Sequence, residues 1–236
     1  MRGVRMSNES HATMRERILV AARLELACVG PVMLSMRAIA REVGVTVGAL
    51  YRYFADRDAV LTELIVEAYE SIGAAARQGV EQGGTPGEQW MRGWSEVRAW
   101  ALAHPQEFAL VYGTPVIGYA APERTIAAAN QLFIALLSIF ARADAAPAAE
   151  HPAPSLTAGL ATDIAQARAW ASAVIGDALD ARFSDARILG FLRAWTELIG
   201  AIGFEMHGHY VGSLDHGDEF FAHIVAAHAK ALDLDN

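Results

Sequence analysis

The side chains best suited to contact another molecule lie in one short segment near the N-terminus. It carries a hydroxyl, two phenols, a guanidinium and two positions with almost no side chain. The residues we expect to face outward are Thr46, Gly48, Ala49, Tyr51, Arg52 and Tyr53. Small residues allow a backbone to approach base edges closely, while phenol and guanidinium groups can reach phosphates. These residue types therefore indicate a surface that enters a DNA groove.

Two short helices joined by a tight turn would position this surface. Ser35 is a suitable N-cap for the first helix. Gly44 would end it, because glycine tolerates the positive φ found at helix C-termini. Thr46 can cap a second helix, which we expect to run from Val47 to Tyr53. This pattern predicts a helix-turn-helix, whose second helix lies in the major groove.

Apolar residues recur at helical spacing on one face of each helix. They are Ile39, Ala40, Val43, Val47, Leu50 and Phe54. A further helix, expected from about Thr13 to Val29, would close a small core with Ile18, Ala22, Leu26 and Val29 facing inward. Residues 1–13 are polar, and we expect an irregular tail there. A fourth helix is expected to begin after Asp56, a suitable N-cap, and to end near Gly79.

Residues 14–66 resemble the DNA-binding region of the tetracycline-repressor (TetR) family of bacterial regulators. The matching residues are Ile18, Ala21, Ala22, Gly30, Ser35–Ala40, Gly44, Val45, Gly48, Leu50, Tyr51, Tyr53, Phe54, Arg57 and Leu61. The chain departs from the family pattern at Glu25, at Pro31 and at Arg57, where lysine is usual. The resemblance implies DNA contacts by Ser35, Arg37, Thr46, Gly48, Ala49, Tyr51, Arg52, Tyr53 and Arg57. For Arg57, a phosphate contact and a local pair with Asp58 are both open.

The rest of the chain shows no strand alternation between turn signals, so we predict an all-α protein. Segments 102–113 and 193–206 resemble a C-terminal domain of the same family, the Trp-His-Gly subgroup, although Thr196 and Glu197 follow Trp195 here. The resemblance implies a three-helix DNA-binding head over residues 12–57. It also implies a helical-bundle domain for ligand binding and dimerisation over residues 58–236. Ala145–Pro154, rich in alanine and proline, is expected to be a loop.

Aromatic residues of the second domain fit either a core or a ligand pocket, because both are built from the same residue types. Six of them are our candidates for lining a pocket: Trp94, Phe108, Tyr112, Phe133, Trp170 and Trp195. Few charged residues lie in the segments 111–121 and 131–140. We therefore expect a small apolar or aromatic effector.

The last two predicted helices have broad apolar faces, together with glycines at 190, 200 and 203 that permit close helix approach. By resemblance, residues 184–210 and 217–232 pair with their copies in a second subunit as a four-helix bundle. A homodimer of this kind places two recognition helices on a palindromic operator in double-stranded DNA.

Charge is distributed unevenly along the 236 residues, whose net charge is −8. Residues 1–60 hold nine arginines and six acidic residues, whereas the remainder carries −11. A basic head on an acidic body fits a DNA-binding module joined to a part that does not touch DNA. One cysteine, Cys28, is consistent with a reducing cytoplasm, and we expect it to be buried.

Other classes of function find no support in the sequence. The most apolar run, Leu132–Ala141, is about half the length that spans a bilayer. The C-terminal histidines lack metal-ligand spacing, and no phosphate loop, nucleophile elbow or zinc-protease motif occurs. We therefore expect no membrane partner, no metal, no cofactor and no enzyme activity. We expect a sequence-specific DNA-binding transcriptional regulator, a cytoplasmic repressor released by the small apolar or aromatic effector. The alternative is a helical oligomerisation or interaction protein with a non-functional helix-turn-helix.

Overall fold

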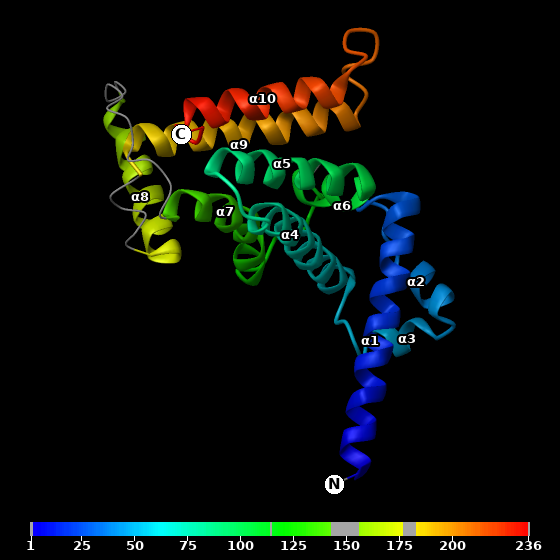
Figure 1. Ribbon diagram of the computed structural model, residues 1–236. Coiled ribbons are helices and arrows are strands. Elements are labelled where there is room, and N and C mark those ends of the chain that lie inside the picture. Colours follow the sequence, from blue (N-terminus) through cyan, green and yellow to red (C-terminus); the bar gives the residue numbers. More distant parts are fainter. Residues whose placement is uncertain (1, 114, 143–155, 177–182, 236) are drawn as a thin grey trace. The chain divides into compact units, whose positions relative to one another are not determined.

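The computed structural model describes residues 2–113, 115–142, 156–176 and 183–235, with the backbone alone for residues 2–12 (Figure 1). These residues form ten α-helices and no strand, so the all-α prediction is confirmed. The helices are α1 (Arg2–Val29), α2 (Met36–Val43), α3 (Val47–Leu50), α4 (Arg57–Glu81), α5 (Pro86–Ala103), α6 (Pro105–Tyr112), α7 (Arg124–Ala141), α8 (Ala158–Ile175), α9 (Asp185–Met206) and α10 (Gly217–Ala231). The loop predicted at 145–154 lies outside the described residues.

The helices form two compact units. The first contains the chain up to Tyr69 together with His104–Ala128, and the second contains Glu70–Ala103 and the described residues from Ala129 onward. Helices α4 and α7 each continue from one unit into the other. The functional boundary expected after residue 57 stays a prediction. The compact unit that contains the helix-turn-helix extends further, to Tyr69, and also includes His104–Ala128.

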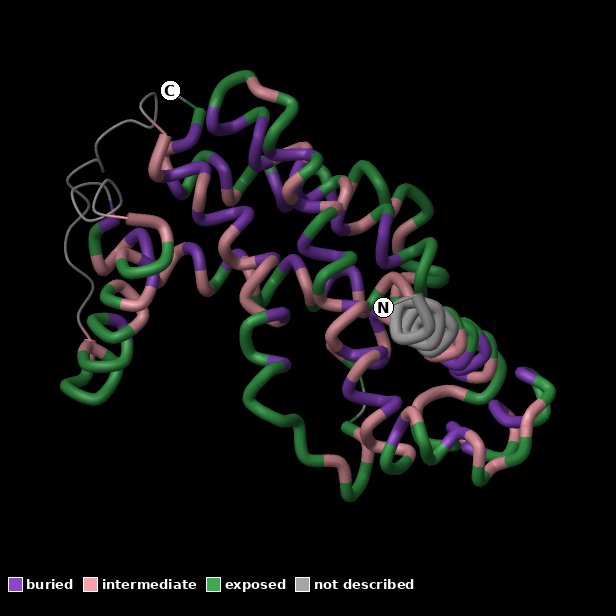
Figure 2. Tube along the Cα trace, turned by 90° about the horizontal axis from the view of Figure 1, so that it is seen from below, coloured by how far each residue is buried: buried purple, intermediate pink, exposed green. Residues whose placement is uncertain are grey.

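A continuous apolar core holds the first unit together. Its buried members include Ile18, Ala22, Leu26, Ile39, Ala40, Val43, Leu50, Phe54, Val60, Leu61 and Leu64. The predicted inward faces of α2 and α3 are thereby confirmed. Along the helices, buried residues alternate with exposed ones, as expected when only one face of a helix is buried (Figure 2). Fully burying one such side chain stabilises the fold by about 1.5–3 kcal/mol. Leu110 of α6 joins the same core, which explains why α6 belongs to this unit.

Helix α1 corrects three predictions. The irregular tail is wrong, because the backbone is helical from Arg2, where the sequence has no proline to stop it. Cys28 is exposed, not buried. It lies two residues after buried Leu26, and a step of about 200° around the helix places it on the opposite face. Val29 is 42% exposed because it ends the helix beside the turn at Gly30.

The second unit is built around tryptophans of α5 and apolar residues of α7. Trp90 and Trp94 are completely buried, as are Leu132, Leu136 and Phe140. Helix α7 is the one described helix long and apolar enough to cross a membrane. That is weak evidence for a membrane, since the core helix of a soluble protein meets the same criteria. The three buried residues of α7 assign it to the core.

Candidate nucleic-acid interface and effector region

The turn between α2 and α3 has the predicted geometry. Gly44 adopts φ 79° and ψ 33°, and its N–H donates to the carbonyl of Ala40 at 3.0 Å. The Thr46 hydroxyl accepts a hydrogen bond from the N–H of Ala49 at 3.2 Å, as an N-cap does. Ser35 lies at the N-cap of α2 with extended backbone, but its hydroxyl makes no capping hydrogen bond. The turn is therefore fixed by Gly44 and Thr46.

Helix α3 is shorter than the Val47–Tyr53 helix expected, since it ends at Leu50. Beyond Leu50 the chain tightens, because the N–H groups of Arg52 and Tyr53 each donate to the carbonyl three residues before. This tighter turn ends at Phe54, which is 3% exposed and belongs to the head core. The segment after α3 thus ends on a residue that is anchored in the core of the first unit.

The predicted DNA-facing residues divide by exposure. Exposed residues are Arg37, Thr46, Gly48, Tyr51 and Arg52, and partly buried ones are Ser35, Ala49, Tyr53 and Arg57. Tyr53 packs against the head core, so its ring also stabilises the unit. A Cβ atom placed at Gly48 would meet no atom within 4 Å. The backbone of α3 is therefore open to a close approach by another molecule.

Arg57 has local partners in the structure. Its Nε lies 3.5 Å from the Asp58 carboxylate, and its Nη1 donates to the carbonyl of Val32 at 3.5 Å. Asp56 caps α4 as predicted, accepting from the N–H of Ala59 at 2.7 Å. The local alternative for Arg57 is the arrangement observed. Its contact with phosphate stays a prediction and requires exchange of Asp58 for the phosphate.

Hydrogen bonds attach α6 and the segment after it to α4 within the first unit. The hydroxyls of Thr62 and Tyr119 share a hydrogen bond of 3.0 Å. The Tyr69 hydroxyl donates to the carbonyl of Val111 at 3.2 Å. The partners are 57 and 42 residues apart, and no local sequence signal indicates them. Sequence reasoning missed these residues, which link α4 to α6 and to the segment that follows it.

An ion-pair network reinforces this attachment. Glu63 of α4 contacts Arg15 of α1 at 2.8 Å and Arg124 of α7 at 2.5 Å. Burial alone would raise the pKa of Glu63, but the hydrogen bonds from both arginines outweigh burial and hold that pKa below its ordinary value. One carboxylate therefore ties three helices together.

The six candidate effector residues are divided between the two units. Phe108 and Tyr112 lie in the first unit, where their ring centroids are 5.2 Å apart. Burial raises the pKa of Tyr112, so its phenol stays neutral. In the second unit, Trp195 lies 3.7 Å from Phe133 and 6.0 Å from Trp94 between ring centroids. A role for any of them in binding stays a prediction.

Trp170 of α8, the sixth candidate, is partly buried. Helix α8 packs against α9. Trp94, Phe133 and Trp195 form a cluster of aromatic rings in the second unit.

Two family models match the chain. The model of bacterial regulatory proteins, tetR family, matches residues 18–64, and that of the tetracyclin repressor-like C-terminal domain matches residues 90–228. The second match alone covers more than half of the sequence. The chain belongs to the tetR family of bacterial regulatory proteins. The predicted resemblance to that family is confirmed.

Known proteins resemble this tetR-family regulator over different lengths. The HTH-type transcriptional regulators Rv1816 of Mycobacterium tuberculosis and Mb1846 of Mycobacterium bovis are each 36% identical over 121 residues, 49% of this chain and 51% of theirs. The chain thus spans about half the length of the curated relatives it matches. The crystal structure of the regulatory protein SCO4313 has a TM-score of 0.69 at 27% identity, covering 94% of this chain and 98% of that one.

A more distant likeness concerns the fold. PfmR, a TetR family transcriptional regulator from Thermus thermophilus, has a TM-score of 0.54 at 18% identity, covering 93% of this chain and 99% of its own. The common fold extends over both units of the tetR-family regulator.

The outer surface of α9 and α10 carries a groove of about 400 Å³. It is lined by Gly190, Arg193, Glu197, Phe220, His223, Ile224, Ala227, His228 and Ala231. A Cβ atom placed at Gly200 or Gly203 would meet no atom within 4 Å, and Phe204 is 56% exposed. His228 pairs with Glu197 at 2.9 Å. This regulator therefore presents small residues and an open apolar side chain on the helices predicted to dimerise.

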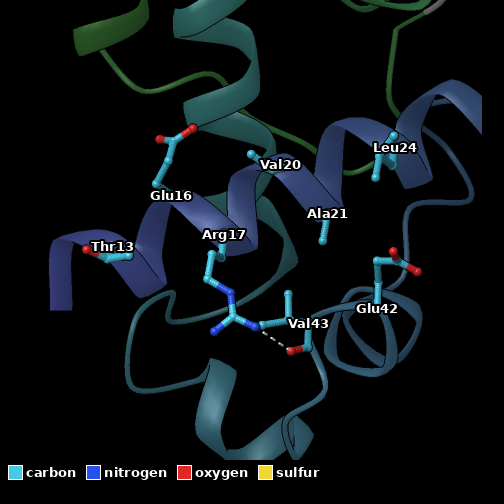
Figure 3. Close-up of a pocket in the computed structure, with 8 residues that line it drawn as sticks. All are labelled: Thr13, Glu16, Arg17, Val20, Ala21, Leu24, Glu42 and Val43. Atoms are coloured by element: carbon cyan, nitrogen blue, oxygen red, sulfur yellow. Dashed lines mark hydrogen bonds between the residues drawn. The ribbon is translucent and has the colours of Figure 1, made fainter. Parts of the chain in front are cut away.

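A second groove, of about 510 Å³, lies between α1 and the end of α2 (Figure 3). Val20, Ala21, Leu24 and Val43 supply its apolar surface. The Arg17 guanidinium crosses it to donate to the carbonyl of Val43 at 3.0 Å (Figure 3). A cation at the C-terminal end of a helix stabilises the unpaired carbonyls there. We assign Arg17 to holding α2 against α1.

Metal ligands do not converge in the part of the regulator that the structure describes. No group of three or more His, Cys, Asp or Glu side chains there can hold an ion. Among the C-terminal histidines, the Nδ1 of His207 lies 2.6 Å from the carbonyl of Gly203, and His228 pairs with Glu197. These two histidines therefore have local partners.

Proposed function

We propose that this tetR-family regulator binds a palindromic operator in double-stranded DNA and represses transcription in the cytoplasm until a small effector releases it. The observation that supports this most directly is the open face of α3. At Gly48 no side chain covers the backbone, and the exposed Tyr51 and Arg52 lie within four residues of it. Residues 12–57 would carry DNA binding, and residues 58–236 ligand binding and dimerisation.

Electrostatics supports DNA as the partner of this face. Arg37 and Arg52 are both exposed, on α2 and just after α3, and residues 1–60 carry a net +3. The acidic remainder disfavours DNA contact elsewhere. Each arginine that neutralises a phosphate releases counterions, so affinity must fall as the salt concentration rises. A protein with a non-functional helix-turn-helix would lack this dependence.

The test measures DNA binding by fluorescence anisotropy, using the region upstream of the regulator's own gene, at several salt concentrations. Arg52→Ala together with Tyr51→Ala should weaken binding by roughly tenfold or more. The salt slope should fall by about one for each phosphate that the variant protomer no longer neutralises. Arg168→Ala is the matched control, because Arg168 forms an exposed pair with Asp185 in the second unit. Binding unchanged by the double substitution would contradict the assignment of this face.

Dimerisation through residues 184–210 and 217–232 is part of the same proposal. The support is the open space at Gly200 and Gly203 and the groove between α9 and α10. Small residues at such positions let two helices approach closely, and a C2 pair buries the same patch twice. A single recognition helix reads few base pairs, so two joined protomers would supply the specificity.

For release, we propose that a small apolar or aromatic effector binds in the second unit and acts on the head through α4. Helix α4 is continuous from Arg57 to Glu81 and so belongs to both units. Thr62, Glu63 and Tyr69 on α4 also hold α6 and the start of α7. An effector can shift DNA binding by no more than its difference in affinity for the two states. Screening small aromatic compounds for release of the operator from the regulator tests this step.

A further inference from the structure

Three tryptophans of α5 differ in how their indole N–H groups are satisfied. Trp90 donates to the carbonyl of Val225 at 3.1 Å, and Trp100 donates to the hydroxyl of Ser71 at 2.8 Å. Trp94 lies between them in the sequence and is completely buried. Its Nε1 is buried with no acceptor among the described residues. The same helix thus pairs two of these donors and leaves the third available.

A buried donor without an acceptor is disfavoured, and almost all such groups in proteins find a partner. We infer that the Trp94 N–H recognises an acceptor atom of the effector, and that the effector is a neutral, planar aromatic molecule carrying such an acceptor, for example a ketone oxygen. This inference rests on the proposed function, in which an effector binds the second unit. It adds the chemical class of the effector and the group that selects it.

The neighbours of Trp94 explain why the molecule should be planar and aromatic. Trp195 packs edge-on against Trp94 with ring centroids 6.0 Å apart, and it stacks on Phe133 at 3.7 Å with an interplanar angle of 31°. Both stacked rings are partly exposed, whereas Trp94 is not. Under this inference, a ligand reaches the Trp94 N–H when one of these two rings turns aside. A planar ligand that replaces this ring restores the stacking that its movement removes.

The surroundings also explain why the molecule should be neutral. Trp90 lies against Trp94 with ring centroids 5.8 Å apart, and it contacts Phe140 and Phe191 in turn. Phe140 and Phe191 are buried. A charged group placed among these rings would lose its hydration without gaining a counter-ion. A neutral acceptor loses far less and gains the N–H of Trp94.

The test uses ¹⁵N-labelled full-length regulator and the NMR signals of its five indole N–H groups. Single Trp→Phe substitutions assign the signals. Acetophenone and isopropylbenzene serve as probes, because they differ chiefly in replacing a ketone oxygen by a methyl group. Acetophenone should move the Trp94 signal downfield and leave those of Trp90 and Trp100 nearly unchanged. Isopropylbenzene should not cause this downfield shift.

Affinity provides the second measurement. Trp94→Phe keeps an aromatic ring and removes the N–H, so it should weaken acetophenone binding by roughly three- to tenfold, the value of one neutral hydrogen bond. It should leave isopropylbenzene binding within about twofold. Trp100→Phe is the control, since it removes an N–H that already has an acceptor, and it should leave acetophenone binding unchanged. Dispersed signals from the other four indoles show that the Trp94→Phe variant is folded, and only those of Trp90 and Trp195, whose rings pack against position 94, should shift slightly.

Two results would overturn the inference: a Trp94 signal that does not respond to acetophenone, or equal acetophenone affinity in the Trp94→Phe variant. A Trp94 signal already downfield and unresponsive would mean that an internal partner satisfies the N–H, which also overturns it. Operator binding is measured separately on the same preparations. Loss of operator binding with an intact response of Trp94 would contradict the proposed function alone, and the reverse result would contradict this inference alone.

Discussion

Replacing Gly200 by arginine separates the stability of one protomer from its assembly. Gly200 lies inside α9, and a Cβ atom placed there would meet no atom within 4 Å in the protomer. The position is therefore open where a side chain leaves the backbone. Arginine also favours the helix over glycine by about 0.8–1 kcal/mol. The protomer should be as stable as the wild type or slightly more stable.

The same substitution should prevent the proposed dimer from forming. If α9 packs against its copy near Gly200, arginine places an unpaired charge in the interface. Leaving a charge buried without a partner costs about 3–5 kcal/mol. The symmetry of a C2 dimer applies this cost twice, so the total is at least about 6 kcal/mol. The dimer dissociation constant should then rise by roughly four orders of magnitude.

Sedimentation velocity measures this directly, because the Gly200→Arg variant should have the mass of one chain at concentrations where the wild type has the mass of two. Affinity for a palindromic operator should fall with it, since the two heads are no longer joined. Gly159→Arg is the matched control, because Gly159 lies in α8 and also has open space around it. A Gly200→Arg variant that remains dimeric would refute the reasoning and place the interface on another surface.

Two further predictions concern the first unit. Glu63→Gln should destabilise this unit by about 1 kcal/mol near neutral pH, because the pairs with Arg15 and Arg124 are partly exposed to solvent. The pKa of Glu63 is lowered by folding, so its contribution is complete above about pH 4.5, the ordinary pKa of glutamate, and is lost as the pH falls through the lower folded pKa. Urea unfolding of both proteins from neutral pH downward should show the difference shrinking as the pH falls below about 4.5, and a difference that grows would contradict the prediction. Tyr119→Phe should cost about 0.5–1 kcal/mol in the same assay, at the low end for a hydrogen bond, because Thr62 keeps its bond to the carbonyl of Asp58. An effect above about 2 kcal/mol would mean that Tyr119 does more than share this bond.

The features predicted correctly from sequence are those fixed by neighbouring residues. A glycine with φ 79° at position 44 and a threonine that caps at position 46 act within four residues of themselves. The apolar period of α2 and α3 is likewise local, and it identified their buried faces. Cys28 shows how a rule of residue type can mislead. Its place on α1 relative to Leu26 indicated exposure, whereas the general tendency of cysteine indicated burial.

Contacts between distant segments could not be predicted from one sequence. Trp90 and Val225 are 135 residues apart, and Glu63 and Arg124 are 61 apart. Periodicity predicts that each residue has a partner on another helix but not which helix supplies it. The aromatic candidates illustrate the same limit. Phe108 and Trp195 looked equivalent by type, yet they belong to different units, because Phe108 lies on α6 with the head.

The allocation of α6 to the head changes how a signal can reach α3. If effector binding in the second unit were transmitted through α4 alone, a movement of α4 would be the only cause of a movement of α3. Leu110 and Tyr119 instead fasten α6 and the following segment to the same core and the same helix that support α3. The chain returns from this segment to the second unit through α7, whose first turn carries Arg124 and its bond to Glu63. Helix α7 therefore runs from the segment held by Glu63 to Phe133 of the aromatic cluster in the second unit. A ligand that turns Phe133 aside would act on a helix whose other end is fixed to the head by Glu63.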